Sequence, residues 1–171
     1  MKKYLYHILF LLVLFLIQNS LATVFSPEAR LVPEFLLLAV TVFSLTHSLQ
    51  ESLWYGFAAG FLMEIFSGLF FGADTFGLVL VALAVYLVTR NLTAQDISAV
   101  AAVFLVIAAT GFFAVATFLF QRLFVFFGLT AAVNPGQFFP LTLVWTAVVN
   151  ATFFYPVKFF AKFLPRDEGP F

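Results

Sequence analysis

The sequence predicts an all-α polytopic membrane protein, a bundle of six transmembrane helices that forms one membrane domain over residues 1–171. Hydrophobic residues make up 64% of the chain and charged residues 9%, which leaves too little polar surface for a water-soluble globule. The apolar runs are continuous, whereas the strands of a membrane barrel alternate apolar and polar residues. Since one span needs roughly 20 apolar residues, the chain has room for about five to seven spans and for no sizeable soluble domain.

Short polar stretches and turn-forming residues divide the apolar sequence into six segments. Pro33 suits the first turn of the second helix, where its missing N–H is harmless, and Glu34 suits the positive end of the helix dipole. Asp74 is expected to cap the fourth helix. The six spans are predicted at residues 4–25, 33–49, 53–71, 75–89, 97–120 and 138–160.

Two of these segments have unusual lengths. The fourth covers roughly 23 Å as a helix, which is less than the hydrocarbon layer. The apolar run at 97–127 would extend roughly 46 Å, which is too long for one span and too short for two. We expect a membrane helix to Phe120, followed by an interfacial stretch over 121–135. A longer helix, kinked at Gly111, is the alternative.

The distribution of Lys and Arg predicts that both termini lie in the cytoplasm. With six spans, one side of the membrane holds Arg30 and Arg122, and the other holds six basic residues. A cleavage site after Ser20-Leu21-Ala22 is an alternative for the first segment, and its use would remove the first span. The six basic residues are Lys2, Lys3, Arg90, Lys158, Lys162 and Arg166.

Four residues of the third segment recur at every fourth position and share one helix face: Gly56, Gly60, Glu64 and Gly68. Small residues at this spacing are typical of close helix packing, either within the chain or with a helix of another chain. A charged side chain at mid-membrane costs roughly 2.5 to 3.5 kcal/mol on insertion scales, so Glu64 should face protein. The face is therefore predicted to be a packing face or a partner-helix site.

Depth along the helices suggests which groups would meet the Glu64 side chain. Counted from the cytoplasmic helix ends, Gln18, Glu64 and Asn150 lie roughly 21, 16 and 14 Å deep. We therefore predict that these three side chains form one buried polar cluster. Such a cluster would fix the helix register, or it would take part directly in a partner contact.

The sequence gives little support to catalysis, metal binding or nucleic-acid binding. The net charge is zero and there is no cysteine. His47 and Glu51 lie four residues apart, but no third ligand is near and the pattern is not HExxH. The serines have no GxSxG setting. We expect no catalytic residue, no metal and no cofactor.

Several features occur together in one order along the chain. A Gln lies near the outer end of the first helix, Pro33-Glu34 opens the second, and the third carries spaced glycines, an acid and Ser67-Gly68. Gly77 and Tyr86 follow. In this order the chain resembles the MreD family, a small polytopic protein of the bacterial rod-shape system. Here the membrane acid is Glu64, where the family more often has Asp.

The resemblance implies a non-enzymatic, multi-pass scaffold in the bacterial inner (cytoplasmic) membrane that helps organise peripheral peptidoglycan synthesis. It implies binding to MreC, a single-span protein, and through it an indirect link to MreB, RodA and an elongation transpeptidase. We hypothesise that the face of Gly56, Gly60 and Gly68 receives the transmembrane helix of MreC.

A second interpretation comes from a different class of protein. Six spans and this chain length are also similar to the vitamin-binding S components of energy-coupling-factor transporters. The first helix of those proteins carries alanines spaced by four, whereas residues 4–17 here contain no Ala or Gly. The scaffold is therefore favoured over the transporter component.

Overall fold

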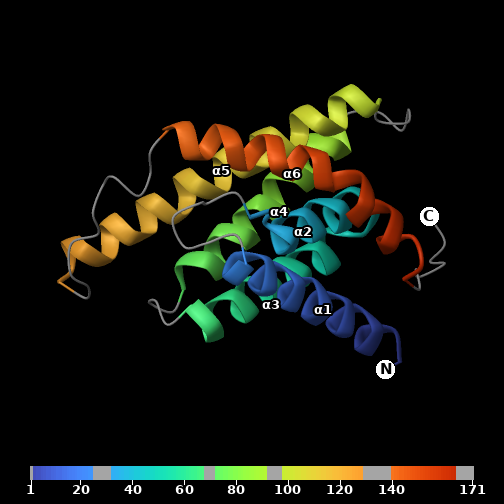
Figure 1. Ribbon diagram of the computed structural model, residues 1–171, viewed down its shortest axis with the longest axis horizontal. Helices are drawn as coiled ribbons and strands as arrows, with labels where there is room; N and C mark the ends of the chain where they lie inside the picture. Colours follow the sequence, from blue (N-terminus) through green and yellow to red (C-terminus); the bar gives the residue numbers. More distant parts are fainter. Residues whose placement is uncertain (1, 25–31, 68–71, 92–97, 129–139, 165–171) are drawn as a thin grey trace.

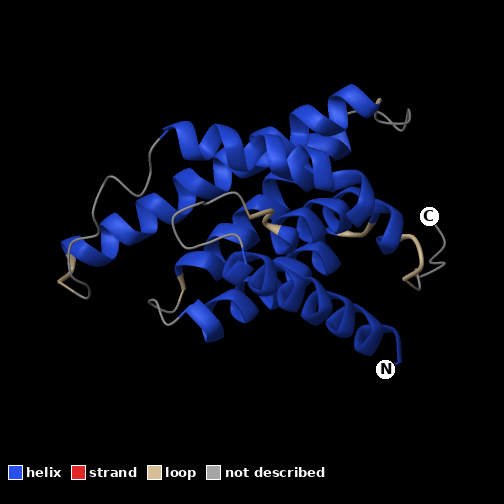
Figure 2. Ribbon diagram, in the orientation of Figure 1, coloured by secondary structure: helices blue, strands red, loops and turns tan. Residues whose placement is uncertain are grey.

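The computed structural model describes residues 2–24, 32–67, 72–91, 98–128 and 140–164. Within these ranges the secondary structure is helical and contains no strand (Figure 2). The fold is therefore all-α, as predicted. Six helices follow one another along the chain: α1 (Lys2–Val24), α2 (Phe35–Thr46), α3 (Leu49–Ser67), α4 (Ala73–Asn91), α5 (Ala99–Phe126) and α6 (Pro140–Ala161).

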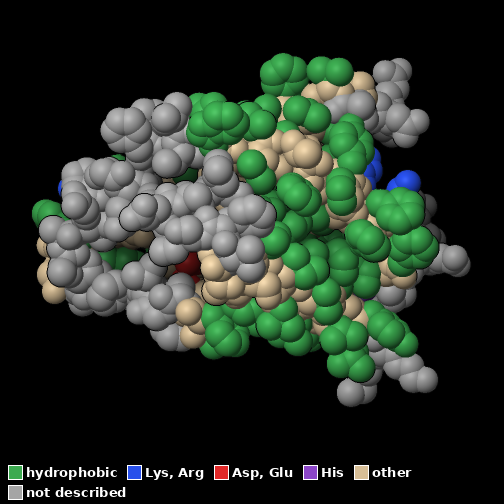
Figure 3. Space-filling view, viewed as in Figure 1, with side chains coloured by type: hydrophobic (Ala, Val, Ile, Leu, Met, Phe, Trp, Pro, Cys, Tyr) green, Lys and Arg blue, Asp and Glu red, His purple; other side chains and the backbone are tan. Residues whose placement is uncertain are grey.

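Four of the six helices, α1, α4, α5 and α6, are long and apolar enough to cross a membrane. Helix α2 is apolar but has only 12 residues, or about 18 Å. On the face drawn in Figure 3, the described side chains are mostly hydrophobic, and Lys and Arg lie only at its edges. These helices give the chain the surface of a membrane protein.

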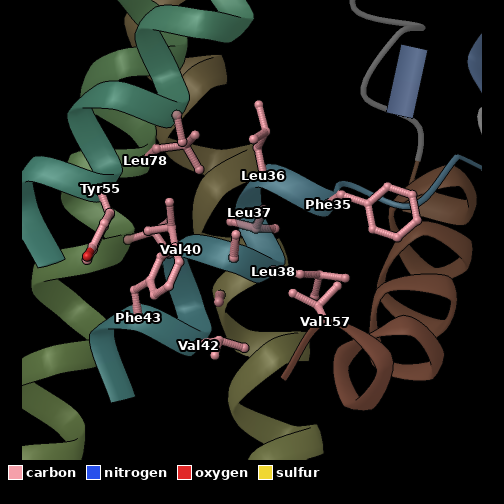
Figure 4. Close-up of a cluster of buried hydrophobic side chains, with 14 of the residues drawn as sticks. Phe35, Leu36, Leu37, Leu38, Val40, Val42, Phe43, Tyr55, Leu78 and Val157 are labelled. Carbon is pink, nitrogen blue, oxygen red and sulfur yellow. The ribbon is translucent and has the colours of Figure 1, made fainter. Parts of the chain in front are cut away.

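The short helix α2 forms the centre of the bundle and packs against all five other helices (Figure 1). Every residue from 35 to 44 is buried, so α2 is surrounded by protein on all its faces. Two buried hydroxyls on α2 bond within the helix, since Thr41 donates to the Leu37 carbonyl and Ser44 to the Val40 carbonyl. Figure 4 shows the side chains of α2 surrounded by those of neighbouring helices.

An aromatic cluster joins the end of α2 to α1 and α3. His7 of α1 is buried, and its ring centroid lies 5.3 Å from that of Tyr55 and 6.0 Å from that of His47. Phe43 stacks on Tyr55 at 4.0 Å. The half-buried His47 therefore packs in this cluster. Only two residues separate α2 from α3.

The helix bounds differ from the predicted ones in two informative places. Helix α4 begins at Ala73 and has 19 residues, so it is not the short segment that we expected. Helix α5 continues to Phe126, which means that residues 121–126 extend the helix. Of the predicted interfacial stretch, residues 129–135 lie outside the described residues.

Candidate functional site

The glycine face of α3 packs against the backbone of α4. A Cβ atom added at Gly60 would lie 2.3 Å from Thr75 Cα, and one added at Gly56 would lie 2.9 Å from the Leu78 carbonyl oxygen. Only glycine permits such an approach, so this packing lies within the chain. The hypothesis that a partner helix docks here is wrong at Gly56 and Gly60, and Gly68 lies outside the described residues.

One turn beyond Gly60, the Glu64 carboxylate binds the start of α4. Its Oε1 accepts hydrogen bonds from the backbone N–H groups of Gly72 (2.6 Å) and Asp74 (3.0 Å), and also from that of Thr75 (3.2 Å). Its Oε2 accepts from the Thr75 hydroxyl at 2.6 Å. The Glu64 side chain is 3% exposed. A carboxylate of α3 thus caps α4.

This arrangement solves the problem of a helix that begins inside the protein. The first N–H groups of a helix have no partner within it, and its N-terminus attracts negative charge. The φ angle of +119° at Gly72, which L residues rarely adopt, turns the chain so that its N–H faces Glu64. The prediction that the Asp74 side chain caps α4 is therefore corrected, because Glu64 accepts from the Asp74 N–H.

The start of α2 is capped differently, by amide side chains from two other helices. Asn150 of α6 accepts from the Glu34 N–H through Oδ1 at 2.8 Å and donates to Glu34 Oε2 at 3.2 Å. Gln18 of α1 accepts from the Leu36 N–H at 3.3 Å. Pro33 immediately precedes Glu34, the N-cap residue of α2.

Asn150 also connects α2 and α6 to α5. Its Nδ2 donates to the Thr110 hydroxyl at 3.1 Å, and that hydroxyl donates to the Val106 carbonyl. Asn150 is 0% exposed, and both N–H bonds and the carbonyl oxygen of its amide have partners. Asn150 therefore links α6 to the start of α2 and to the middle of α5.

The structure thus divides the three predicted cluster residues between two networks. Glu64 bonds to the start of α4, while Gln18 and Asn150 bond to the start of α2. The prediction of one buried polar cluster is therefore corrected, because these side chains cap two different helices. Both networks lie in one bundle, since α2 packs directly against α4.

Two hydroxyl groups of these networks were not predicted from the sequence. Thr75 directly follows Asp74 in the first turn of α4, and Thr110 is one of few polar residues in the long apolar run of α5. An isolated Thr inside a span is a useful signal, because its hydroxyl must find a partner away from water. Within the described residues, no group of three or more His, Cys, Asp or Glu side chains could hold a metal ion.

Comparison with known proteins completes the description. The family model described as "rod shape-determining protein MreD" matches residues 1–164. No curated protein and no solved structure matches the chain. The family match extends through all six helices and includes both buried helix starts. The chain therefore belongs to the MreD family, a family of rod shape-determining membrane proteins and not a known enzyme family.

Proposed function

We propose that this protein is a non-enzymatic scaffold of the elongation machinery in the bacterial inner membrane. In this proposal it binds MreC, and it is linked indirectly to MreB, RodA and an elongation transpeptidase that build peripheral peptidoglycan. The observation that carries the proposal is the match to the MreD family over residues 1–164.

The arrangement of the helix ends supports a cytoplasmic location for both termini. The start of α1, the end of α4 and the end of α6 lie towards the same side of the bundle in Figure 1. Arg90 lies at this end of α4, and Lys158 and Lys162 lie at this end of α6. Basic residues gathered at one end favour the cytoplasmic side of a membrane.

The outward face of α3 is the contact surface that we propose for the MreC helix. Because the glycine face packs on α4, a partner helix that contacts α3 would use another side of it. Trp54, Phe57 and Phe61 project from the bundle as an exposed aromatic ladder, with successive ring centroids 6.1 and 6.0 Å apart. Aromatic side chains are enriched at the centres of protein interfaces.

Co-purification of MreC with paired variants tests this surface. The double variant Phe57→Ala/Phe61→Ala should weaken the complex about thirtyfold or more, since an aromatic anchor at the centre of an interface contributes more than about 1 kcal/mol. The matched control is Phe104→Ala/Phe112→Ala, which removes two exposed rings from α5. Equal yields from the two double variants would exclude the aromatic ladder as the contact.

The alternative function, that of a vitamin-binding S component of an energy-coupling-factor transporter, stays a prediction.

A further inference from the structure

Helix α5 is longer than the other helices that could cross the membrane. Its apolar span, Val100–Phe126, has 27 residues, whereas the spans of α1, α4 and α6 have 18 or 19. At 1.5 Å per residue, the span of α5 is roughly 13 Å longer than those of these neighbours. If its first residues lie at one membrane surface, its last turns reach the opposite surface.

The final turns of α5 carry an isolated positive charge. Arg122 is the only Asp, Glu, Lys or Arg in the sequence between Asp96 and Lys158. Its side chain is exposed, and its guanidinium lies 5.1 Å from the centroid of the Phe118 ring, one turn earlier. This cation–π contact holds the guanidinium over one face of the ring, and its N–H donors stay accessible because the side chain is exposed.

The depth of Arg122 matches a headgroup layer. The residue lies 23 positions after Ala99, the first residue of α5, which corresponds to roughly 35 Å along the helix. The hydrocarbon core is about 30 Å thick, so a helix with ordinary tilt brings Arg122 to the level of the phosphates. At mid-membrane the same side chain would cost roughly 2.5 to 3.5 kcal/mol.

The two faces of this part of α5 have different environments. One face packs on the start of α4, where Phe120 stacks on Phe76 at 5.3 Å and Phe124 lies 3.8 Å from the Cβ position of Gly72. The opposite face is exposed and apolar around the guanidinium, and Phe126 is 81% exposed. The exposed residues are Leu119, Leu123, Phe126 and Phe127.

We propose that residues 118–127 form a lipid anchor in which Arg122 binds a phospholipid phosphate. The planar guanidinium donates paired hydrogen bonds to phosphate oxygens, while the exposed side chain of Leu119, one turn nearer the membrane centre, lies among the upper acyl chains. The occupant is a phospholipid because the surface combines one cation with an apolar surround at headgroup depth. The anchor fixes how deep α5 sits, and with it the start of α4.

Spin labels on single cysteines measure that depth directly, since the chain has no native cysteine. A label at Phe126→Cys in phospholipid vesicles should collide with a water-soluble nickel reagent and with oxygen in the ratio typical of the phosphate layer. A label at the exposed Val115→Cys should show the oxygen-rich ratio of the hydrocarbon. Equal ratios at the two positions would overturn the interfacial placement.

Lipid retention tests Arg122 itself. The proteins are mixed with micelles of phosphatidylglycerol and phosphatidylcholine, and native mass spectrometry measures which lipid stays bound. The preference for the anionic phosphatidylglycerol should be about fivefold weaker in Arg122→Gln than in the wild type. Arg122→Lys should keep about half of it, because the charge stays and the paired geometry is lost. Arg90→Gln, which removes an exposed charge at the other end, is the control. A loss no greater in Arg122→Gln than in Arg90→Gln would overturn the assignment, and an unchanged melting temperature confirms that each variant is folded.

Discussion

The starts of α2 and α4 pose the same physical problem and are capped by different chemistry. Each helix begins inside the protein with N–H groups that need acceptors. Helix α4 receives a carboxylate from the helix just before it, whereas α2 receives two neutral amides from α6 and α1. Hydrogen bonds to a charged group contribute about 1.5 to 3 kcal/mol each, against about 0.5 to 1.5 for neutral pairs.

The difference indicates how the bundle is built. Glu64 and its partners lie 8 to 11 residues apart, so α3 and α4 can form their joint unit by local contacts. Asn150 lies 116 residues from Glu34, so the start of α2 is complete only when α6 has packed. We therefore expect the α3–α4 pair to be the most stable unit of the fold. The start of α2 is expected to be stable only when α6 is packed against it.

Replacing Gly60 should break the α3–α4 unit and have the largest effect. In Gly60→Leu the new Cβ would overlap the Thr75 backbone, so the helices must separate and Glu64 must lose its partners. We expect a loss of unfolding free energy of about 4 kcal/mol or more, measured by denaturation in mixed micelles.

The matched control for that variant is Gly111→Leu in α5. A Cβ added at Gly111 meets no atom within 4 Å, so stability should change by less than about 0.5 kcal/mol. A similar loss in both variants would show that the larger side chain itself is responsible, and that close packing at Gly60 is not, because Leu has a higher helix propensity than Gly.

Removing the carboxylate should have the next largest effect. Glu64→Ala leaves three N–H groups and one hydroxyl without their acceptor, and we expect a loss of about 3 to 5 kcal/mol. Glu64→Gln keeps one acceptor oxygen and should lose about half as much. If Gln and Ala reduced the unfolding free energy equally, the charge at the start of α4 would be the deciding term.

The amide cap of α2 should be weaker. Asn150→Leu removes the partner of the Glu34 N–H, of Glu34 Oε2 and of the Thr110 hydroxyl, and we expect a loss of about 2 kcal/mol in the same assay. Thr152→Val, which removes an exposed hydroxyl two residues away on α6, should be nearly neutral. A loss larger than that of Glu64→Ala would reverse the comparison between the two helix starts.

The helical class and the number of helices could be predicted, because both follow from composition and from polar breaks. The roles of individual helices could not. A continuous apolar run looks the same whether it faces lipid or protein, so α2 resembled an ordinary span although it is the buried centre. The end of α5 was also misplaced, since Gln121 and Arg122 suggested a boundary where the helix in fact continues.

The candidate site was predictable in its members but not in its pairings. The cost of a membrane charge singled out Glu64, and isolated amides singled out Gln18 and Asn150. Depth alone could not distinguish a partner side chain from a helix start at the same level. The sequence does contain one signal for the partner of Glu64. Gly72 indicates a turn soon after α3, and an antiparallel helix that follows such a turn must begin beside the last turns of α3, where Glu64 lies.

The bond from Gln18 to the Leu36 N–H should matter least, and it measures how firmly α1 holds the start of α2. This bond is single, neutral and 3.3 Å long, and interhelical hydrogen bonds in membranes average only about 0.6 kcal/mol. Gln18→Leu should therefore lower global stability by about 0.5 kcal/mol but increase hydrogen exchange at the Leu36 amide about threefold. Asn19→Leu is the control, since the Asn19 amide bonds to the Phe15 carbonyl of its own helix. If the Leu36 amide exchanged at the wild-type rate in Gln18→Leu, α2 would be held by Asn150 and packing alone, and α1 would be a peripheral helix.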